Sequence, residues 1–399
     1  MSVFVIGQGY VGLSISTAAA TAGHTVIGFD IDAELTQNLR NGKSHIEGIS
    51  NTLVTELLSS GRLTFSNNPS EMAGSEVVVI AVPTPLDSKK APDLSYVHKA
   101  ADLIAAHATT PALIINESTS FPGTLRGEIA GRLSQSCGIE FEYASAPERV
   151  DPGNPNFTVR NTPRIVSGMT QTASNLALAF YESFCDYVTI VETPEVAEMA
   201  KLLENTFRQV NIALVNQMAL ITNKLGISIH QVIEAAATKP FGFMKFTPGL
   251  GVGGHCIPVD PSYLLYSAKN VGVSATFIEL ANQVNDEMVQ TVIDIVESRI
   301  NASIQGKKIC VVGLSYKSDI ADLRESPSIR LILRLREIGC QVTWSEPLIK
   351  NWNGETSSKI SESVVAIIAI NHSSLKTEEF DGCQFVFDCT GRFAEFPTF

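Results

Sequence analysis

Basic residues are scarce in this sequence, and its cysteines show no pairing pattern. Lys and Arg number 29 against 41 Asp and Glu, giving a formal net charge of −12, which argues against nucleic acid or an anionic membrane as the main partner. The seven cysteines include no CxxC pair and no framework spacing, so we expect reduced thiols in a cytoplasmic protein. No second cluster with ligand spacing accompanies His255 and Cys256, so no metal is expected.

Long apolar runs are also missing. No uninterrupted stretch is long enough to span a bilayer, and residues 2–6 already have the character of a core strand, with no signal peptide before them. With 44% hydrophobic and 18% charged residues, a chain of 399 residues should form two or three globular domains. We therefore expect a soluble protein without a membrane partner.

Strands alternate with helical segments in the first half of the chain. Residues 3–30 have a βαβ pattern, and further strands are predicted at 77–82, 112–116 and 141–145, each followed by a loop of turn or polar residues. This alternation predicts a parallel doubly wound sheet, whose ligands bind beyond the carboxyl ends of the strands.

The pattern changes at Thr193, which suits a helix N-cap before Pro194. Residues 194–225 contain no helix breaker, which predicts a helix of roughly 45 Å, long enough to join domains and to form the core of a homodimer. A second α/β unit opens at 307–313, with later strands at 341–344, 364–370 and 385–388. The prediction is an α/β fold with two Rossmann-like doubly wound domains (1–192 and 301–399) joined by a central helical domain (193–300).

A glycine-rich turn follows the first strand. Gly7, Gly9 and Gly12 lie between a strand and a helix, and Asp30 ends the next strand 18 residues after Gly12. In such a turn the first glycine makes the bend, the second admits a pyrophosphate and the third lets helix meet strand. Asp30 would bind an adenosine ribose and repel a 2′-phosphate, so NAD is favoured over NADP.

The run GLGVGGHCIPVDP, residues 249–261, places Cys256 between a glycine-crowded loop and a helix start at Asp260 and Pro261. Glycines let a ligand approach the backbone, and a helix N-terminus favours a thiolate. A nucleophilic cysteine is the functional interpretation, and a buried inert cysteine beside a turn is the alternative. Asp260 is either a functional residue or only the N-cap of the helix that begins at Pro261.

Three further groups have both a catalytic and an ordinary interpretation. Lys201 and Asn205, four residues apart, share one helix face and form either a catalytic pair or an exposed polar stripe. Glu148 lies in a loop after a strand, where it is either functional or merely solvated. Lys317, Asp322 and Arg324 form either a phosphate site or a charged loop.

Taken together, these segments resemble the UDP-glucose/GDP-mannose dehydrogenase family over essentially the whole chain. The matching segments are VIGQGYVG (5–12), AVPTP (81–85), ESTSFPGT (117–124), APERVDPGNPNF (146–157), EVAEMAKLLENTFRQVNIALVNQ (195–217), KPFGFMKFTPGLGVGGHCIPVDP (239–261) and GLSYKSDIADLRESPS (313–328). The resemblance implies an NAD-dependent four-electron oxidation of C6 of a UDP-sugar to the uronate, of the kind used in polysaccharide biosynthesis.

The resemblance also implies roles for individual residues. Cys256 would capture the C6 aldehyde and carry the thioester, and Lys201 and Asn205 would stabilise the oxyanion. Asp260 would act with water as the base, and Glu148 with Thr119 would orient or activate the hydrolytic water. The implied cofactor contacts are Gly7, Gly9, Tyr10, Val11, Gly12, Asp30, Thr84, Thr119 and Arg324, and the implied substrate contacts are Glu148, Arg149, Lys201, Asn205, Phe246, Gly249, Gly253 and Lys317.

Departures from the family pattern bear on the sugar. Val259 stands where the glucose branch usually has lysine, and the segments ESTSFPG, PERVDPGNP and TKPFGFM are most similar to the branch that oxidises UDP-N-acetylglucosamine. UDP-N-acetylmannosamine and UDP-glucose are the alternative substrates. A two-electron β-hydroxyacid dehydrogenase needs no cysteine and an inactive nucleotide-sugar-binding regulator would lack Cys256 or Lys201, so both are disfavoured.

Overall fold

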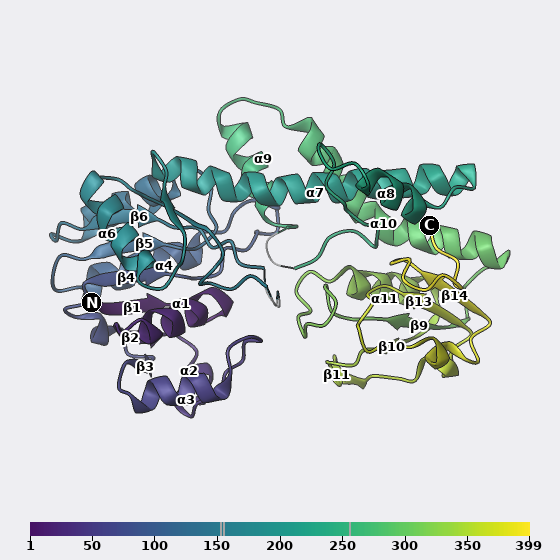
Figure 1. Ribbon diagram of the computed structural model, residues 1–399, viewed down its shortest axis with the longest axis horizontal. Helices are drawn as coiled ribbons and strands as arrows, with labels where there is room; N and C mark the ends of the chain where they lie inside the picture. Colours follow the sequence, from purple (N-terminus) through teal and green to yellow (C-terminus); the bar gives the residue numbers. More distant parts are fainter. Residues whose placement is uncertain (152–153, 155, 255–256) are drawn as a thin grey trace. The chain divides into compact units, whose positions relative to one another are not determined.

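The computed structural model describes residues 1–151, 154, 156–254 and 257–399 and contains two compact units. The N-terminal unit comprises Met1–Glu204 with Ser262–Val271, and the C-terminal unit comprises Asn205–Pro261 with Gly272–Phe399. Helices and strands of both are labelled in Figure 1. The division of the chain into three domains at residues 192 and 300 stays a prediction.

The N-terminal unit contains an eight-stranded sheet of order β3-β2-β1-β4-β5-β6-β7-β8. Its strands are β1 (Ser2–Ile6), β2 (Thr25–Phe29), β3 (Leu63–Ser66), β4 (Val77–Ile80), β5 (Leu113–Asn116), β6 (Glu142–Ser145), β7 (Arg164–Gly168) and β8 (Val188–Ile190). Its helices are α1 (Tyr10–Thr21), α2 (Ala33–Arg40), α3 (Asn51–Ser59), η1 (Pro69–Met72), α4 (Ser95–His107), the π-helix η2 (Leu125–Ala130), α5 (Gly131–Ser136) and α6 (Gln171–Glu182).

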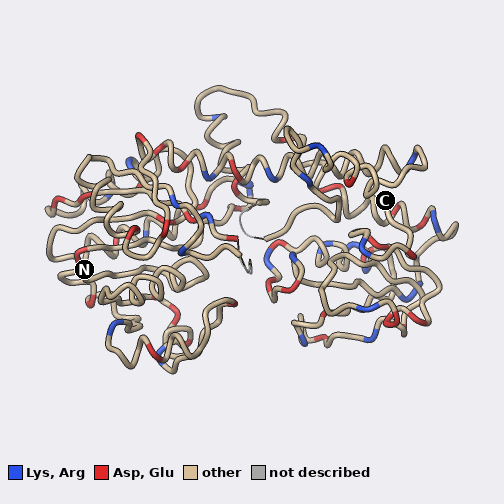
Figure 2. Tube along the Cα trace, viewed as in Figure 1, with Lys and Arg blue, Asp and Glu red and all other residues tan. Residues whose placement is uncertain are grey.

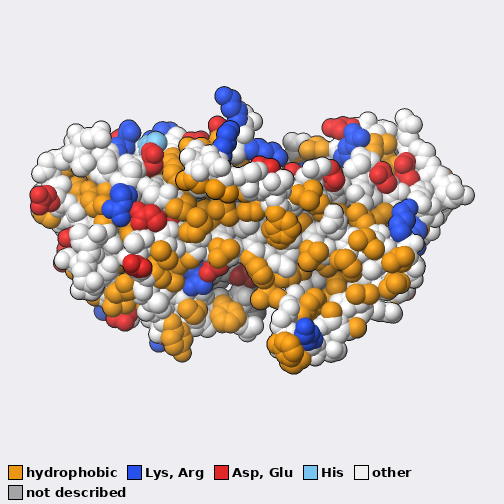
Figure 3. Space-filling model, turned by 90° about the horizontal axis from the view of Figure 1, so that it is seen from above, with side chains coloured by type: hydrophobic (Ala, Val, Ile, Leu, Met, Phe, Trp, Pro, Cys, Tyr) orange, Lys and Arg blue, Asp and Glu red, His pale blue; other side chains and the backbone are white. Residues whose placement is uncertain are grey.

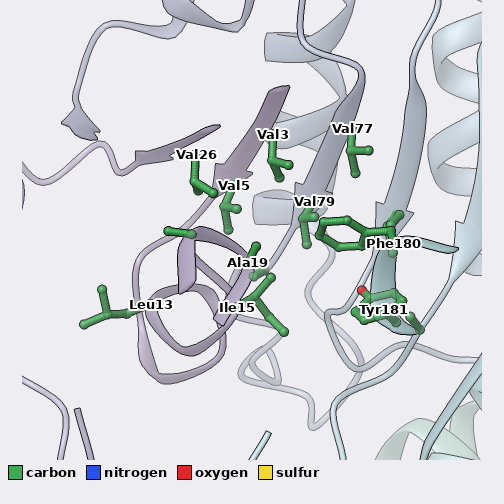
Figure 4. Packing of buried hydrophobic residues seen from close by; sticks show 14 of the residues in the cluster. Val3, Val5, Leu13, Ile15, Ala19, Val26, Val77, Val79, Phe180 and Tyr181 are labelled. Carbon is green, nitrogen blue, oxygen red and sulfur yellow. The ribbon is translucent and has the colours of Figure 1, made fainter. Parts of the chain in front are cut away.

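The core of this unit follows from the alternation of side chains along each strand. Val3 and Val5 of β1 and Val77 and Val79 of β4 point to the same side, where they are buried in one cluster with residues of α1 and α6 (Figure 4). Phe180 and Tyr181 of α6 belong to this cluster as well.

One pair of strands departs from the predicted parallel order. Strands β1 to β6 are mutually parallel, but β7 pairs antiparallel with β6 through Ala144 opposite Gly168 and Ser145 opposite Ser167. An antiparallel neighbour needs no right-handed crossover helix, and none of the described residues between β6 and β7 lies in a helix or strand. This reversal brings the start of β7 next to the ends of β5 and β6.

Helix α7 (Pro194–Leu225) has the predicted bounds. The side-chain oxygen of Thr193 accepts the Val196 N–H at 3.3 Å, and Gly226 follows the helix with φ +70°. The residues of α7 up to Glu204 belong to the N-terminal unit, and those from Asn205 belong to the C-terminal unit. Helix α9 (Asp260–Asn270) likewise begins in the C-terminal unit.

The C-terminal unit contains a four-stranded parallel sheet of order β10-β9-β13-β14, as the second α/β pattern predicts. Its elements are α8 (Ile229–Ala237), α10 (Thr276–Ile300), β9 (Lys308–Val312), α11 (Pro327–Ile338), β10 (Gln341–Ser345), β11 (Asn351–Trp352), β12 (Glu355–Thr356), η3 (Ile360–Glu362), β13 (Val365–Ile368), η4 (Thr377–Phe380) and β14 (Phe385–Asp388). The core packs α10 and α11 against this sheet.

Figure 2 shows acidic and basic residues interspersed along the traces of both units. None of the helices in the described part of the chain is both long enough and apolar enough to cross a membrane. Within the described ranges, no group of three or more His, Cys, Asp or Glu side chains could hold a metal ion.

Candidate active site

The glycine turn after β1 has the geometry that a dinucleotide requires. A Cβ on Gly7, whose φ is +90°, would lie 2.4 Å from the Ala81 carbonyl oxygen, and one on Gly12 would lie 1.8 Å from the Gly7 carbonyl oxygen. A Cβ on Gly9, in contrast, would meet nothing within 4 Å. The first and third glycines are therefore needed by the fold, and the second leaves open space at the start of α1.

Helix α1 begins at this open space. Gly9 is its N-cap and supplies no side-chain cap, and no acidic residue lies in its first turn. Because the first N–H groups of a helix lack intrahelical partners and carry partial positive charge, they suit a pyrophosphate. Tyr10 and Val11, both half-buried, form this first turn. The residues present thus fit NAD.

Asp30 connects the turn to the end of β2. Its Oδ2 accepts the Gln8 N–H at 2.7 Å, and its Oδ1 accepts the Asp32 N–H at 3.0 Å. In folds of this kind an acidic residue at the end of the second strand binds the ribose of a dinucleotide, and that role for Asp30 stays a prediction. Thr84, the predicted cofactor contact after β4, is buried, and its carbonyl oxygen accepts the Tyr263 hydroxyl at 3.2 Å.

The loops after β5 and β6 contain the next group of predicted residues. Thr119 is half-buried, and its neighbour Ser118 ties this loop to the preceding one, because the Ser118 hydroxyl accepts the Val82 N–H at 2.9 Å. Glu148 is buried, and its Oε1 accepts the N–H groups of Arg149 and Val150, each at 2.7 Å.

A buried arginine that the sequence did not single out binds Glu148. Arg164, the first residue of β7, donates from Nη2 to Glu148 Oε2 at 2.7 Å. Burial acts to raise the pKa of Glu148, but Arg164, the Val150 N–H and Lys201 outweigh it, so this pKa is lowered. Glu148 is therefore an ionised carboxylate at neutral pH.

Helix α7 adds two buried side chains to this part of the N-terminal unit. Lys201 is 8% exposed, and its charge acts on Glu148. Glu198, one turn earlier, accepts the Gly123 N–H at 2.7 Å and the Leu125 N–H at 2.9 Å, and so fixes the end of the Thr119 loop. Burial raises the pKa of Glu198 to about 7.

Arg149, predicted to contact substrate, pairs with α7 in this structure. Its Nε and Nη2 bind the two carboxylate oxygens of Glu204 at 3.1 and 2.5 Å, and its Nη1 donates to the Pro163 carbonyl oxygen at 2.8 Å. The Arg149 side chain is 27% exposed. Its contact with substrate stays a prediction.

The C-terminal unit holds the second group of predicted residues. Asn205 Nδ2 donates to Asp260 Oδ2 at 2.5 Å, and Asp260, 1% exposed, is the first residue of α9. Cys256 and His255 lie outside the described residues. The Asn205–Asp260 pair joins α7 to the segment that follows the predicted nucleophile by four residues.

The glycine loop before Cys256 is attached on both sides. Gly249 N–H donates to Asn216 Oδ1 of α7 at 2.9 Å, and Gly254 N–H donates to the Arg324 carbonyl oxygen at 2.9 Å. A Cβ on Gly253 would lie 2.7 Å from Tyr316 Cβ. A glycine at this position therefore lets the loop backbone lie against the Tyr316 side chain.

The other predicted ligand contacts are spread over the same unit. Phe246 packs edge-on against Phe207 of α7, with ring centroids 6.0 Å apart. Arg324 binds Asp322, with 2.6 Å between Nη2 and Oδ2, and Lys317 is half-buried in the loop after β9. The predicted site residues therefore fall into two groups, one in each compact unit, and their individual roles stay predictions.

Comparison with known proteins identifies the family. Profiles of the UDP-glucose/GDP-mannose dehydrogenase family match its NAD-binding domain at residues 1–185, its central domain at 195–287 and its UDP-binding domain at 310–391. The chain belongs to this family. It is an NAD-dependent oxidoreductase of nucleotide sugars, which confirms the predicted family, enzyme class and cofactor.

The relatives include enzymes for two epimeric sugars. The UDP-N-acetyl-D-mannosamine dehydrogenase of Pyrococcus horikoshii is 35% identical over 390 residues, covering 96% of this chain and 92% of the relative. The UDP-N-acetyl-D-glucosamine 6-dehydrogenase of Pseudomonas aeruginosa is 34% identical over 360 residues, covering 88% and 83%. A solved structure of the P. horikoshii enzyme has a TM-score of 0.90 at 32% identity and covers 100% of this chain and 97% of that one, which confirms the predicted fold class.

Proposed function

We propose that this enzyme oxidises C6 of a UDP-N-acetylhexosamine to the carboxylate, with UDP-N-acetylglucosamine as the predicted substrate. UDP-N-acetylmannosamine is the second candidate, because the P. horikoshii relative named for that sugar matches nearly the whole chain. The observation that carries the sugar class is the match to relatives named for UDP-N-acetyl-D-mannosamine and UDP-N-acetyl-D-glucosamine. The Asn205–Asp260 hydrogen bond supports the chemistry, because it joins α7 to the start of α9, four residues after Cys256 in the sequence.

The proposed reaction proceeds in three stages. Bound NAD⁺ supplies the acceptor for one hydride in each of two oxidations. In the first stage the C6 hydroxyl loses its proton to water held by Asp260 while C6 gives up a hydride, which leaves an aldehyde. The Cys256 thiolate then adds to C6, and oxidation of this thiohemiacetal leaves a thioester. Water finally attacks the thioester, which releases the carboxylate and restores the thiol.

The buried charges of the N-terminal unit support the assigned roles. Lys201 is a cation 8% exposed, and a positive charge in such a setting stabilises an oxyanion more than it would in water. Glu148 is an ionised acceptor, which suits it to orient the attacking water with Thr119. We also infer action in the cytoplasm, because the six described cysteines are all free, as in reducing compartments.

A substrate panel tests the proposal. UDP-N-acetylglucosamine, UDP-N-acetylmannosamine and UDP-glucose are compared by kcat/KM and by NADH formed per sugar. A site built around an acetamido group leaves polar groups unpaired with glucose, so UDP-glucose should be the poorest of the three. If UDP-glucose is the best substrate, the acetamido assignment is wrong, although the four-electron chemistry can still stand.

The predicted preference for NAD is tested at Asp30. Asp30→Ala removes a carboxylate that would bind the ribose, so kcat/KM for NAD should fall by about ten- to a hundredfold and the NAD/NADP ratio should fall with it. Asp32→Ala is the matched control, because Asp32 caps α2 through its own side chain. Wild-type enzyme that uses NADP as well as NAD would contradict the role of Asp30.

A further inference from the structure

One buried cation joins the two loops that carry Thr119 and Glu148. Arg164 Nη1 lies 2.7 Å from each carboxylate oxygen of Glu117, which directly follows β5, while Nη2 lies 2.7 Å from Glu148 Oε2, after β6. The side chains of Arg164 and Glu117 are 3% and 0% exposed. Arg164 also lies over the Tyr181 ring, 4.6 Å from its centroid, and the Tyr181 hydroxyl donates to Glu117.

These contacts leave Glu148 a single orientation. Oε1 is held by two backbone N–H groups of its own loop, and Oε2 is held by the guanidinium. Because β7 runs antiparallel to β6, its first residue, Arg164, lies at the edge where β6 ends, and its side chain reaches Glu148 after β6 and Glu117 after β5. The reversal in the sheet is thus what supplies the cation.

Stability alone is a poor reason for such a cluster. Removing ions from water is costly, and buried ion pairs are often replaced by apolar residues without loss of stability. The cluster of Arg164, Glu117 and Glu148 contains two carboxylates for one guanidinium. It therefore fixes the positions of three charged groups, although removing them from water costs free energy. A functional reason therefore fits these contacts better than a structural one.

We propose that Arg164 is a positioning residue of the reaction, which holds Glu148 as an oriented carboxylate for the water that hydrolyses the Cys256 thioester. This inference rests on the proposed function. Arg164 itself acts through Glu148 and Glu117, so it is expected to affect hydrolysis of the covalent intermediate more than binding of NAD.

The electrostatics of the cluster agree with this role. Burial raises the pKa of Glu117 to about 7, whereas Arg164, the Val150 N–H and Lys201 outweigh burial at Glu148 and lower its pKa. The charged and titratable groups that act on Arg164 and Glu148 are Glu117, Tyr181, Cys185 and Lys201. Without Arg164, burial would raise the pKa of Glu148, and a protonated Glu148 could not accept a proton from water.

The test compares Arg164→Met and Arg164→Lys with the control Arg160→Met. Arg160 precedes the same strand and forms an exposed ion pair with Asp186, its side chain being 79% exposed. Four quantities are measured with UDP-N-acetylglucosamine and UDP-N-acetylmannosamine: kcat, KM, the pH dependence of kcat, and the fraction of enzyme carrying a covalent sugar after acid quenching.

Arg164→Met should lower kcat by about a hundredfold, the lower end of what a proton-accepting group contributes, with KM for NAD unchanged. The sugar adduct should accumulate, and the acid limb of the kcat profile should move to higher pH. Arg164→Lys keeps a charge but cannot bridge both carboxylates, so it should recover part of kcat. Arg160→Met should behave as wild type.

Either of two results overturns the proposal: a folded Arg164→Met enzyme with wild-type kcat, or a loss of kcat without adduct and without a shifted pH profile. If the Met variant does not fold, the Lys variant decides by the same adduct and pH readouts. Failure of the proposed function is distinguishable, because wild-type enzyme would then form no adduct during turnover with either sugar.

Discussion

Cys256→Ser is expected to abolish turnover while leaving substrate and NAD binding intact. A serine hydroxyl is far less acidic than a thiol and a poorer nucleophile near neutral pH, so the aldehyde would not be captured. Removing the nucleophile of a covalent mechanism should lower kcat by at least about 10⁴-fold. The readouts are NADH formation, calorimetric binding of the UDP-sugar, and a slow single oxidation if the first hydride transfer survives.

Cys137→Ser is the matched control, because Cys137 is a half-buried thiol at the end of α5 in the N-terminal unit. Peptide mass spectrometry of Glu148→Gln, in which hydrolysis should be slow, is expected to locate a sugar on Cys256. Full activity in Cys256→Ala would exclude the covalent mechanism.

The second prediction with a large expected effect concerns the formation of a homodimer. Helix α7 presents exposed apolar side chains spaced mostly three or four residues apart, which forms a stripe along one face of the helix. They are Val196, Met199, Leu203, Phe207, Leu214, Met218, Ile221 and Leu225. Figure 3 shows many hydrophobic side chains on the face of the molecule that is seen from above. An apolar stripe of this length indicates an interface, and we expect it to form the core of a homodimer.

Leu214→Glu combined with Ile221→Glu should convert the dimer to monomer. These side chains are 56% and 51% exposed in the single chain, so charges there should cost little in folding but much in an apolar interface. Leu333→Glu is the control, because Leu333 is a similarly exposed leucine (48%) on α11 and is not part of the stripe. Sedimentation of the three proteins at micromolar concentration is the measurement, and a monomeric wild type would refute the dimer.

Sequence periodicity predicted the elements whose signals are local. The turn at Gly7 and Gly12, the alternating valines of β1 and the uninterrupted run of α7 all depend on neighbours a few residues away. Strand β7 was not predicted, and neither was its antiparallel pairing with β6, because a strand of five residues has only a weak local signal and its sequence does not indicate the direction of its neighbour.

The buried charges were missed for a related reason. Arg164 meets Glu117 across 47 residues and Glu148 across 16, and an isolated charged residue is usually exposed. Glu198 on α7 has the sequence appearance of a solvated helix residue, and only the folded Thr119 loop buries it. Buried charges of this kind can be identified only from the tertiary structure, which brings together loops that are distant in the sequence.

The most direct test of the account counts NADH against sugar. With limiting UDP-N-acetylglucosamine or UDP-N-acetylmannosamine and excess NAD⁺, the enzyme should form two NADH per sugar consumed, and mass spectrometry should show a carboxylate at C6. One NADH per sugar with an aldehyde as the released product would contradict the covalent four-electron mechanism.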